Sequence, residues 1–271
     1  MAKTGQVSYK TQKAFIIYPE KCTGCRACQV ACKNWNQLPA VATENRGSFE
    51  NPPSLNPSTY TKIKFNEFST GSDNGDNFHY GIKWLFLKQQ CLHCTEATCM
   101  IVCPSPGALV RTSEGIVINN PDKCIGCKYC VMTCPFEVPQ FNPITQKISK
   151  CHLCHDRVAN GLIPACAHAC PTGAIQYGDR DKLIAEAKAS GADHIYGEKE
   201  LNGLHVMYVL KDSPEKYGLP QNPKVPSSVF WWKNIFKPII KWGVPLTIVA
   251  TLIHFWFHGP HVIEEKKGGD Q

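Results

Sequence analysis

Residues 124–135 read Cys124-Ile-Gly-Cys127-Lys-Tyr-Cys130-Val-Met-Thr-Cys134-Pro135, and their spacing decides the fold. The pattern C-x2-C-x2-C-x3-C-P is typical of loops that bind iron–sulfur clusters. One tight loop supplies three thiolates, and Gly126 lets its backbone approach a cluster because glycine has no Cβ. Cys134 lies just past the loop, where such a cysteine serves a second cluster if two are present. Pro135 ends any helix at that point.

Three related runs bring the cysteine count to 16. The first run has Lys33 where proline is expected, so we predict a helix that continues through Cys32 to Asn36. The second run has a wider gap between its second and third cysteines, and the fourth contains an eleven-residue insertion. The three runs are Cys22, Cys25, Cys28 and Cys32; Cys91, Cys94, Cys99 and Cys103; and Cys151, Cys154, Cys166 and Cys170.

Two other uses of so many cysteines fit the pattern less well. Disulfide scaffolds are usually short chains, and they do not require cysteines in tight groups of four. Structural zinc prefers two separated C-x2-C pairs, and only the fourth run resembles that arrangement. Four histidines lie beside the cysteines, but each run already has four thiols, so we expect them to form hydrogen bonds instead of ligating metal. These histidines are His93, His152, His155 and His168.

The formal net charge of +7 does not indicate nucleic-acid binding. Four oxidised [4Fe–4S] clusters with their thiolates would add about −8, which leaves the loaded protein near neutral. Positive side chains beside a cluster favour its reduced, more negative form. Six basic residues next to the cysteines fit this role: Lys21, Arg26, Lys33, Lys123, Lys128 and Lys150.

The elements between the cysteine runs predict an α+β fold with the outline of a ferredoxin module. Strand, cysteine loop, short helix, Cys-Pro and strand follow one another, and the series then repeats. Residues 46–59 are rich in Pro, Asn and Ser and predict a loop. We predict strands at 14–18, 60–68, 79–87, near 107–118 and at 204–210, a turn at 69–77, a helix at 181–189 and a linker at 211–228.

The C-terminal part contains a candidate membrane helix. Residues 242–257 are almost entirely apolar, and extension back to Ile235 gives 23 residues, enough to cross a bilayer. Trp231, Trp232, Trp242 and Trp256 are placed to lie at the two interfaces. A buried core helix is the alternative, which the terminal position and the preceding Pro-rich segment weaken. His254 and His258 either face a haem or quinone site on a partner or are solvated.

The membrane orientation stays open at this point. Lysines precede the helix and also follow it, and their count slightly favours a cytoplasmic cluster domain. Residues 1–6 lack the apolar stretch and the twin arginine of an export signal, so we expect no signal peptide of its own.

Taken together, these motifs resemble the iron–sulfur β subunits of membrane-bound formate dehydrogenases of the N type. The resemblance covers nearly the whole chain and rests on the four runs, the Pro-rich insert before Lys62, and the stretches 151–157, 170–175 and 205–210, with one C-terminal helix. The cysteine runs alone are also similar to those in dimethyl sulfoxide, nitrate and polysulfide reductase subunits and in some hydrogenase subunits, which remain the alternatives. A zinc-stabilised interaction module is a more remote one.

The resemblance implies four [4Fe–4S] clusters in two ferredoxin-like modules with large insertions. Its domains would be residues 1–36 with 146–215 as the outer module, 85–145 as the inner module, 37–84 as an inserted hairpin, 216–234 as a linker, 235–258 as the transmembrane helix and 259–271 as a tail. It also implies which cysteines share a cluster. The four sets are Cys22, Cys25, Cys28 and Cys170; Cys91, Cys94, Cys99 and Cys134; Cys103, Cys124, Cys127 and Cys130; and Cys32, Cys151, Cys154 and Cys166.

The same resemblance implies an electron-transfer subunit with no catalytic site of its own. Its partners would be a catalytic subunit with a molybdenum or tungsten pterin, a membrane cytochrome b and membrane lipid, with no nucleic acid. A catalytic partner that carries a twin-arginine signal would export both subunits together, and we therefore expect the cluster domain on the periplasmic side of the inner membrane.

Overall fold

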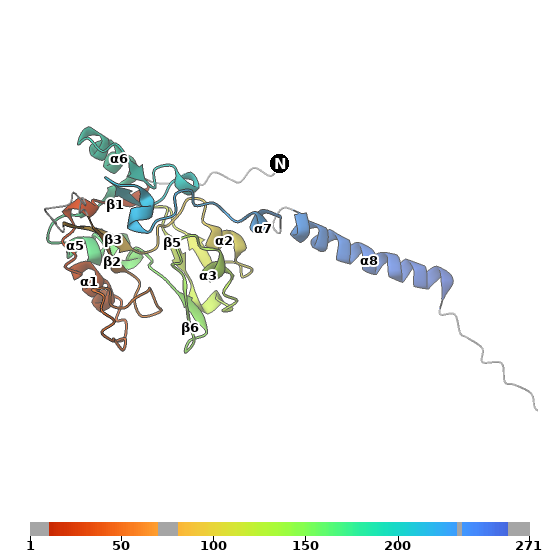
Figure 1. The fold of residues 1–271 in the computed structure, drawn as a ribbon. Coiled ribbons are helices and arrows are strands. Elements are labelled where there is room, and N and C mark those ends of the chain that lie inside the picture. Colours follow the sequence, from red (N-terminus) through yellow and green to blue (C-terminus); the bar gives the residue numbers. More distant parts are fainter. Residues whose placement is uncertain (1–10, 70–80, 232–234, 260–271) are drawn as a thin grey trace, which may run out of the picture. The chain divides into compact units, whose positions relative to one another are not determined.

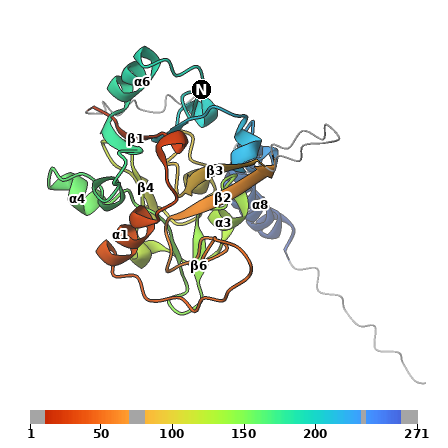
Figure 2. The same cartoon turned by 60° about the vertical axis from the view of Figure 1, so that its left-hand side comes forward.

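The computed structural model describes residues 11–69, 81–231 and 235–259. The chain divides into two compact units, residues 1–225 and 226–271, which are described separately. Figures 1 and 2 show the first unit from two directions.

A four-stranded sheet joins the beginning of the first unit to its end. Its strand order is β8-β1-β10-β9. β1 pairs parallel with β10, where Phe15 opposes Val206, and antiparallel with β8, where Phe15 opposes Tyr177. The strands are β1 (Lys13–Ile17), β8 (Ile175–Asp179), β9 (Ile195–Tyr196) and β10 (Val206–Val209).

Side-chain alternation gives this sheet two buried faces. Ala14 and Ile16 pack with Leu183 and Ala187 of helix α6 (Arg180–Ala189). Phe15 and Ile17 point to the other face, into a core that contains several of the cysteines. β1 is therefore buried on both faces, which explains its uninterrupted apolar sequence.

Three antiparallel hairpins complete the strands of the first unit. The longest pairs β2 with β3 from Lys62 opposite Gln89 to Ser69 opposite Ile82 (Figure 2). The strand bounds are β2 (Lys62–Ser69), β3 (Ile82–Gln89), β4 (Leu109–Arg111), β5 (Val117–Asn119), β6 (Gln140–Asn142) and β7 (Lys147–Ser149).

Short helices follow the cysteine loops. α1 packs against α5, and α2 packs against α3 (Figure 1). The α-helices are α1 (Ala27–Trp35), α2 (Thr98–Val102), α3 (Tyr129–Thr133), α4 (His155–Ala159) and α5 (Ala165–His168). The 3-10 helices are η1 (Pro19–Lys21), η2 (Pro121–Lys123), η3 (Glu200–Asn202) and η4 (Pro214–Tyr217).

The second unit contains α7 (Ser227–Trp231) and the 22-residue α8 (Lys237–His258). Residues 238–258 of α8 have a mean hydropathy of 1.5, and none of them is buried inside the protein. By length and composition α8 is able to cross a membrane. Pro245 lies inside the helix and removes one backbone N–H from its hydrogen bonding.

The predicted strands at 14–18, 60–68 and 204–210, the helix at 181–189 and the extension of the first helix past Cys32 are confirmed. The strand predicted at 79–87 is confirmed from Ile82 onward, and its residues 79 and 80 lie outside the described residues. The turn predicted at 69–77 lies almost wholly outside the described residues. The first half of the segment predicted as a linker, residues 211–228, is part of the folded first unit. There η4 forms, and Tyr217 and Leu219 are buried, because these two apolar side chains join the core of the first unit.

Candidate iron–sulfur sites

Two of the cysteine loops share one local design. A 3-10 helix that begins with proline precedes each loop, and the first cysteine donates its backbone N–H to that proline's carbonyl: Cys22 to Pro19 (3.0 Å) and Cys124 to Pro121 (3.1 Å). Both loops then contain a glycine with positive φ, Gly24 at 66° and Gly126 at 70°. The residues just before α1 and α3, Arg26 and Lys128, are also left-handed. The sequence therefore repeats a turn that presents its thiols to one side.

Gly126 is needed for space as well as for conformation. A Cβ at this position would lie 2.4 Å from the Gln146 carbonyl oxygen, which belongs to the backbone and cannot rotate away. At Gly24 a Cβ would meet the rings of Phe65 and Phe86 at 3.0 Å. The hairpin β2–β3 thus lies directly on the first cysteine loop.

The first cavity of interest is lined by cysteines of the first and fourth runs, which lie far apart in the sequence. Its lining includes four cysteines together with Phe86 and Lys88 of β3. Three come from the first loop and one from the Cys-Pro end of the fourth run. They are Cys22, Cys25, Cys28 and Cys170.

A second cavity, formed by the middle of the chain, is also lined by four cysteines. Four cysteines line it, three from the second run and one from the end of the third, with Val117 and Lys150 beside them. They are Cys91, Cys94, Cys99 and Cys134.

The remaining cysteines are close enough to affect one another's ionisation. Burial raises the pKa of Cys130 to about 12, and the nearby Cys127, Cys103 and Cys124 add to the effect. Burial likewise raises the pKa of Cys32 to about 12, with Cys166, Cys154 and Cys28 as contributing neighbours. Burial also dominates the raised pKa of Cys151, whose neighbours include Cys32 and Cys166.

This donor set fits iron–sulfur clusters. Thiols buried in apolar surroundings hold their protons, and metal binding replaces those protons with positive charge. Among the described residues, no three His, Cys, Asp or Glu side chains converge closely enough to hold a single metal ion. A zinc ion draws four sulfurs to about 2.3 Å from its centre, whereas a cube of iron and sulfide needs its four thiols spread around a larger volume. Cavities ringed by cysteines match the second requirement.

Both ring nitrogens of His152 have protein partners, whereas His93 has a partner for Nδ1 and a buried Nε2 without one among the described residues. The Val117 N–H donates to Nδ1 of His93 (3.1 Å). The His155 N–H donates to Nδ1 of His152 (3.3 Å), and Nε2 of His152 lies 2.6 Å from Oδ1 of Asn36. These contacts favour the predicted hydrogen-bonding role over metal ligation.

Sequence reasoning overlooked one buried lysine near the thiols. Lys88 is 3 % exposed and lines the first cavity. Lys150, which was predicted to balance charge, is 2 % exposed and lines the second, where its Nζ contacts the carbonyls of Val117 and Cys151. Lys88 was missed because it lies in a strand that reads as part of an insertion. The sequence feature that could have identified Lys88 is its place on the same strand face as two aromatic residues, Trp84 and Phe86.

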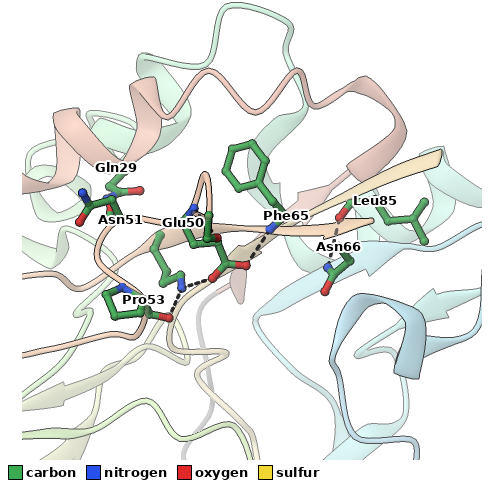
Figure 3. Close-up of polar contacts among 9 residues, drawn as sticks. Gln29, Glu50, Asn51, Pro53, Phe65, Asn66 and Leu85 are labelled. Atoms are coloured by element: carbon green, nitrogen blue, oxygen red, sulfur yellow. Dashed lines mark hydrogen bonds and ion pairs between the residues drawn. The ribbon is translucent and has the colours of Figure 1, made fainter. Parts of the chain in front are cut away.

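The Pro-rich insertion is fixed to the cysteine-bearing elements. Figure 3 shows the Glu50 carboxylate pointing toward Phe65, whose N–H it accepts at 2.9 Å. The same carboxylate pairs with Lys62, which is buried and also donates to the Pro53 carbonyl. From α1, Gln29 donates to the Asn51 carbonyl (2.9 Å). The insertion is therefore held against both β2 and the helix that contains Cys28 and Cys32.

Comparison with known proteins agrees with this chemistry. Residues 82–180 match the family described as a 4Fe-4S dicluster domain, and residues 19–35 match a 4Fe-4S binding domain. The formate dehydrogenase-O iron-sulfur subunit of Escherichia coli K12 is 36% identical over 96% of this chain and 88% of its own length. The formate dehydrogenase iron-sulfur subunit of Haemophilus influenzae is 38% identical over 95% and 84%.

A reductase subunit is also similar over a shorter stretch. This subunit of the anaerobic dimethyl sulfoxide reductase of E. coli K12 is 35% identical over 64% of the present chain and 76% of its own length. The matched families and these relatives identify this chain as an electron-transfer subunit with 4Fe–4S clusters. The chain belongs to the iron–sulfur subunits of formate dehydrogenases.

Proposed function

We propose that this subunit relays electrons through four [4Fe–4S] clusters, from a formate-oxidising catalytic subunit with a molybdenum or tungsten pterin to a cytochrome b in the membrane. Each cluster, when bound, accepts and gives up one electron at a time. The chain's own residues hold the clusters by their thiols, exclude water from them and set the charge around them. The observation that carries the proposal is a cavity lined by four cysteines that come from two distant runs.

The proposed ligand sets are those expected from the family. Two of them are supported by the cysteines that share a cavity, Cys22, Cys25, Cys28 and Cys170, and Cys91, Cys94, Cys99 and Cys134. The other two are supported by the mutual effects on pKa within Cys103, Cys124, Cys127 and Cys130, and within Cys32, Cys151, Cys154 and Cys166. All sixteen cysteines are used once.

The proposed modules are supported by the sheet topology. β1 pairs with both β8 and β10, and this pairing supports one outer module of residues 1–36 and 146–215 around two ligand sets. Residues 85–145 contribute most of the inner module. We further propose that α8 anchors the chain in the inner membrane, with the cluster domain on the periplasmic side. Its length, its hydropathy and its exposed apolar side chains support the anchor.

Iron and acid-labile sulfide analysis of the anaerobically purified complex tests the relay. We expect about 16 iron atoms and about 16 sulfides per chain, with a broad visible absorbance that dithionite bleaches. A count near four iron atoms, or stoichiometric zinc without sulfide, would refute it.

The similarity to a dimethyl sulfoxide reductase subunit supports a second candidate function, in which the chain is the same relay in a reductase complex. The subunit that co-purifies with this chain distinguishes the two. Formate-dependent reduction of a viologen dye in that preparation supports the dehydrogenase, and oxidation of the reduced dye by a sulfoxide supports the reductase.

A further inference from the structure

Lys88 is a buried cation that has no carboxylate partner among the described residues. No carboxylate of the described residues lies within ion-pair distance of its ammonium group. Its Nζ contacts Oε1 of Gln90, and the Phe15 ring centroid lies 5.8 Å away. A neutral amide and an aromatic face compensate a buried charge only in part, so such a lysine is unfavourable unless negative charge is close by.

The strand places Lys88 against the cysteines. In β3, alternate side chains point to opposite faces, so Lys88 shares a face with Phe86 while Leu85 and Leu87 share the other. Phe86 lies on the first cysteine loop, as its contact with the Gly24 position shows. Lys88 and Phe86 both line the cavity of Cys22, Cys25, Cys28 and Cys170.

The backbone of Lys88 is fixed from two sides. Its residue opposes Ile63 across the hairpin, and the Tyr208 hydroxyl of β10 donates to its carbonyl oxygen at 2.6 Å. Tyr208 is fully buried. The backbone of Lys88 is therefore fixed where the hairpin contacts the four-stranded sheet, and its side chain is buried at that position.

We propose that Lys88 raises the reduction potential of the cluster held by Cys22, Cys25, Cys28 and Cys170 through its charge, without ligating that cluster. This inference rests on the proposed relay. A positive charge at this position stabilises the reduced, more negative form of a cluster. The cluster of the first cysteine loop would then accept an electron more readily than it would beside a neutral side chain.

Redox titration followed by EPR tests the inference on the purified complex with the full chain. Lys88→Met keeps most of the length of the side chain and removes the charge. We expect the ratio of reduced to oxidised cluster at a fixed solution potential to fall about tenfold for one of the four clusters, which corresponds to about 59 mV for a one-electron couple. Lys88→Arg should keep that potential near the wild-type value.

The matched control is Lys188→Met on α6, which removes the same charge from a lysine that is 54% exposed and paired with Glu198. It should shift none of the four potentials. The inference is wrong if Lys88→Met leaves all potentials unchanged, or if both variants shift all four alike. It is also wrong if Lys88→Met and Lys88→Gln lose iron while Lys88→Arg keeps it, because the charge would then serve assembly. A wild-type complex that lacks four clusters contradicts the proposed relay instead.

Discussion

Cys134 shows how little a cysteine's position in the sequence says about the cluster it serves. It belongs to the third run, yet in the structure it lines a cavity with three cysteines of the second run. Burial raises its pKa to about 11, with hydrogen bonds from Val138 and Phe136 acting in the opposite direction. Spacing predicted that Cys134 is a ligand, but it left open whether Cys134 serves the loop of its own run or the loop of another run.

Cys134→Ser should therefore disturb the cluster of the second run. A serine oxygen is a poorer iron ligand than a thiolate, so we expect the EPR signal of one cluster to be lost or altered. Cys99→Ser should affect the same signal, and Cys130→Ser a different one. The ligand sets are wrong if Cys134→Ser and Cys130→Ser remove the same signal.

The sequence predicted only some of the lysines that lie beside the cysteines. Lys150 was expected to balance charge because it stands next to Cys151 in the sequence. Lys88 is three residues from Cys91 but lies beside cysteines that are remote in the sequence. Only the pairing of strands reveals which loop a strand face covers, and that information is absent from local spacing.

The insertion of residues 37–61 is an element without regular strands or α-helices of its own, and it depends on a few polar contacts. The pair between Glu50 and Lys62 is its main attachment, with Lys62 1% exposed and Glu50 20% exposed. Lys33 of α1 adds a hydrogen bond to the Ser58 carbonyl (2.8 Å). A partly buried ion pair of this kind is costly to break from one side, because the remaining charge stays buried.

Glu50→Gln should loosen this element. The amide can still accept the Phe65 N–H, but it leaves the Lys62 ammonium without a counter-charge. We expect a loss of about 1–3 kcal/mol in the free energy of unfolding. Hydrogen exchange should speed up over residues 49–60 in particular.

The control for this substitution lies in the same loop. Glu44 pairs with Arg46, and both side chains are largely exposed, so Glu44→Gln should leave stability and exchange unchanged. Equal effects of the two substitutions would show that the Glu50 pair does not anchor the insertion.

The regular elements were the most predictable level of the structure. β1 and β10 are short apolar runs, and β2 alternates from Lys62 to Asn66, so their local sequence already favours a strand. The local sequence did not reveal that β10 pairs parallel with β1, nor that Tyr217 continues the core after the last strand. Both depend on contacts between the two ends of the chain.

At the scale of the molecule, the two units have opposite surface character. The first buries its apolar side chains in cores that include cysteines, while α8 exposes Leu246, Ile248, Leu252 and Phe257 by more than half. Such a helix is unstable in water by itself and is favourable in hydrocarbon.

A chain that ends at Val225 should therefore be released from membranes without detergent. Its iron content should equal that of the full chain, since all sixteen cysteines lie before that residue. Membrane fractionation with iron analysis measures both properties. A full chain that is already soluble without detergent would contradict the proposed anchor.

The placement of β1 also implies an order in time. Phe15 opposes Tyr177 and Val206 in the sheet, so β1 stays without its strand partners until both have been synthesised. Cys22, Cys25 and Cys28 are synthesised early, but the cavity that they line also needs Cys170. The cavity of Cys91, Cys94, Cys99 and Cys134 needs no cysteine after Cys134. We therefore expect the cysteines that are synthesised first to be enclosed later than those in the middle of the chain.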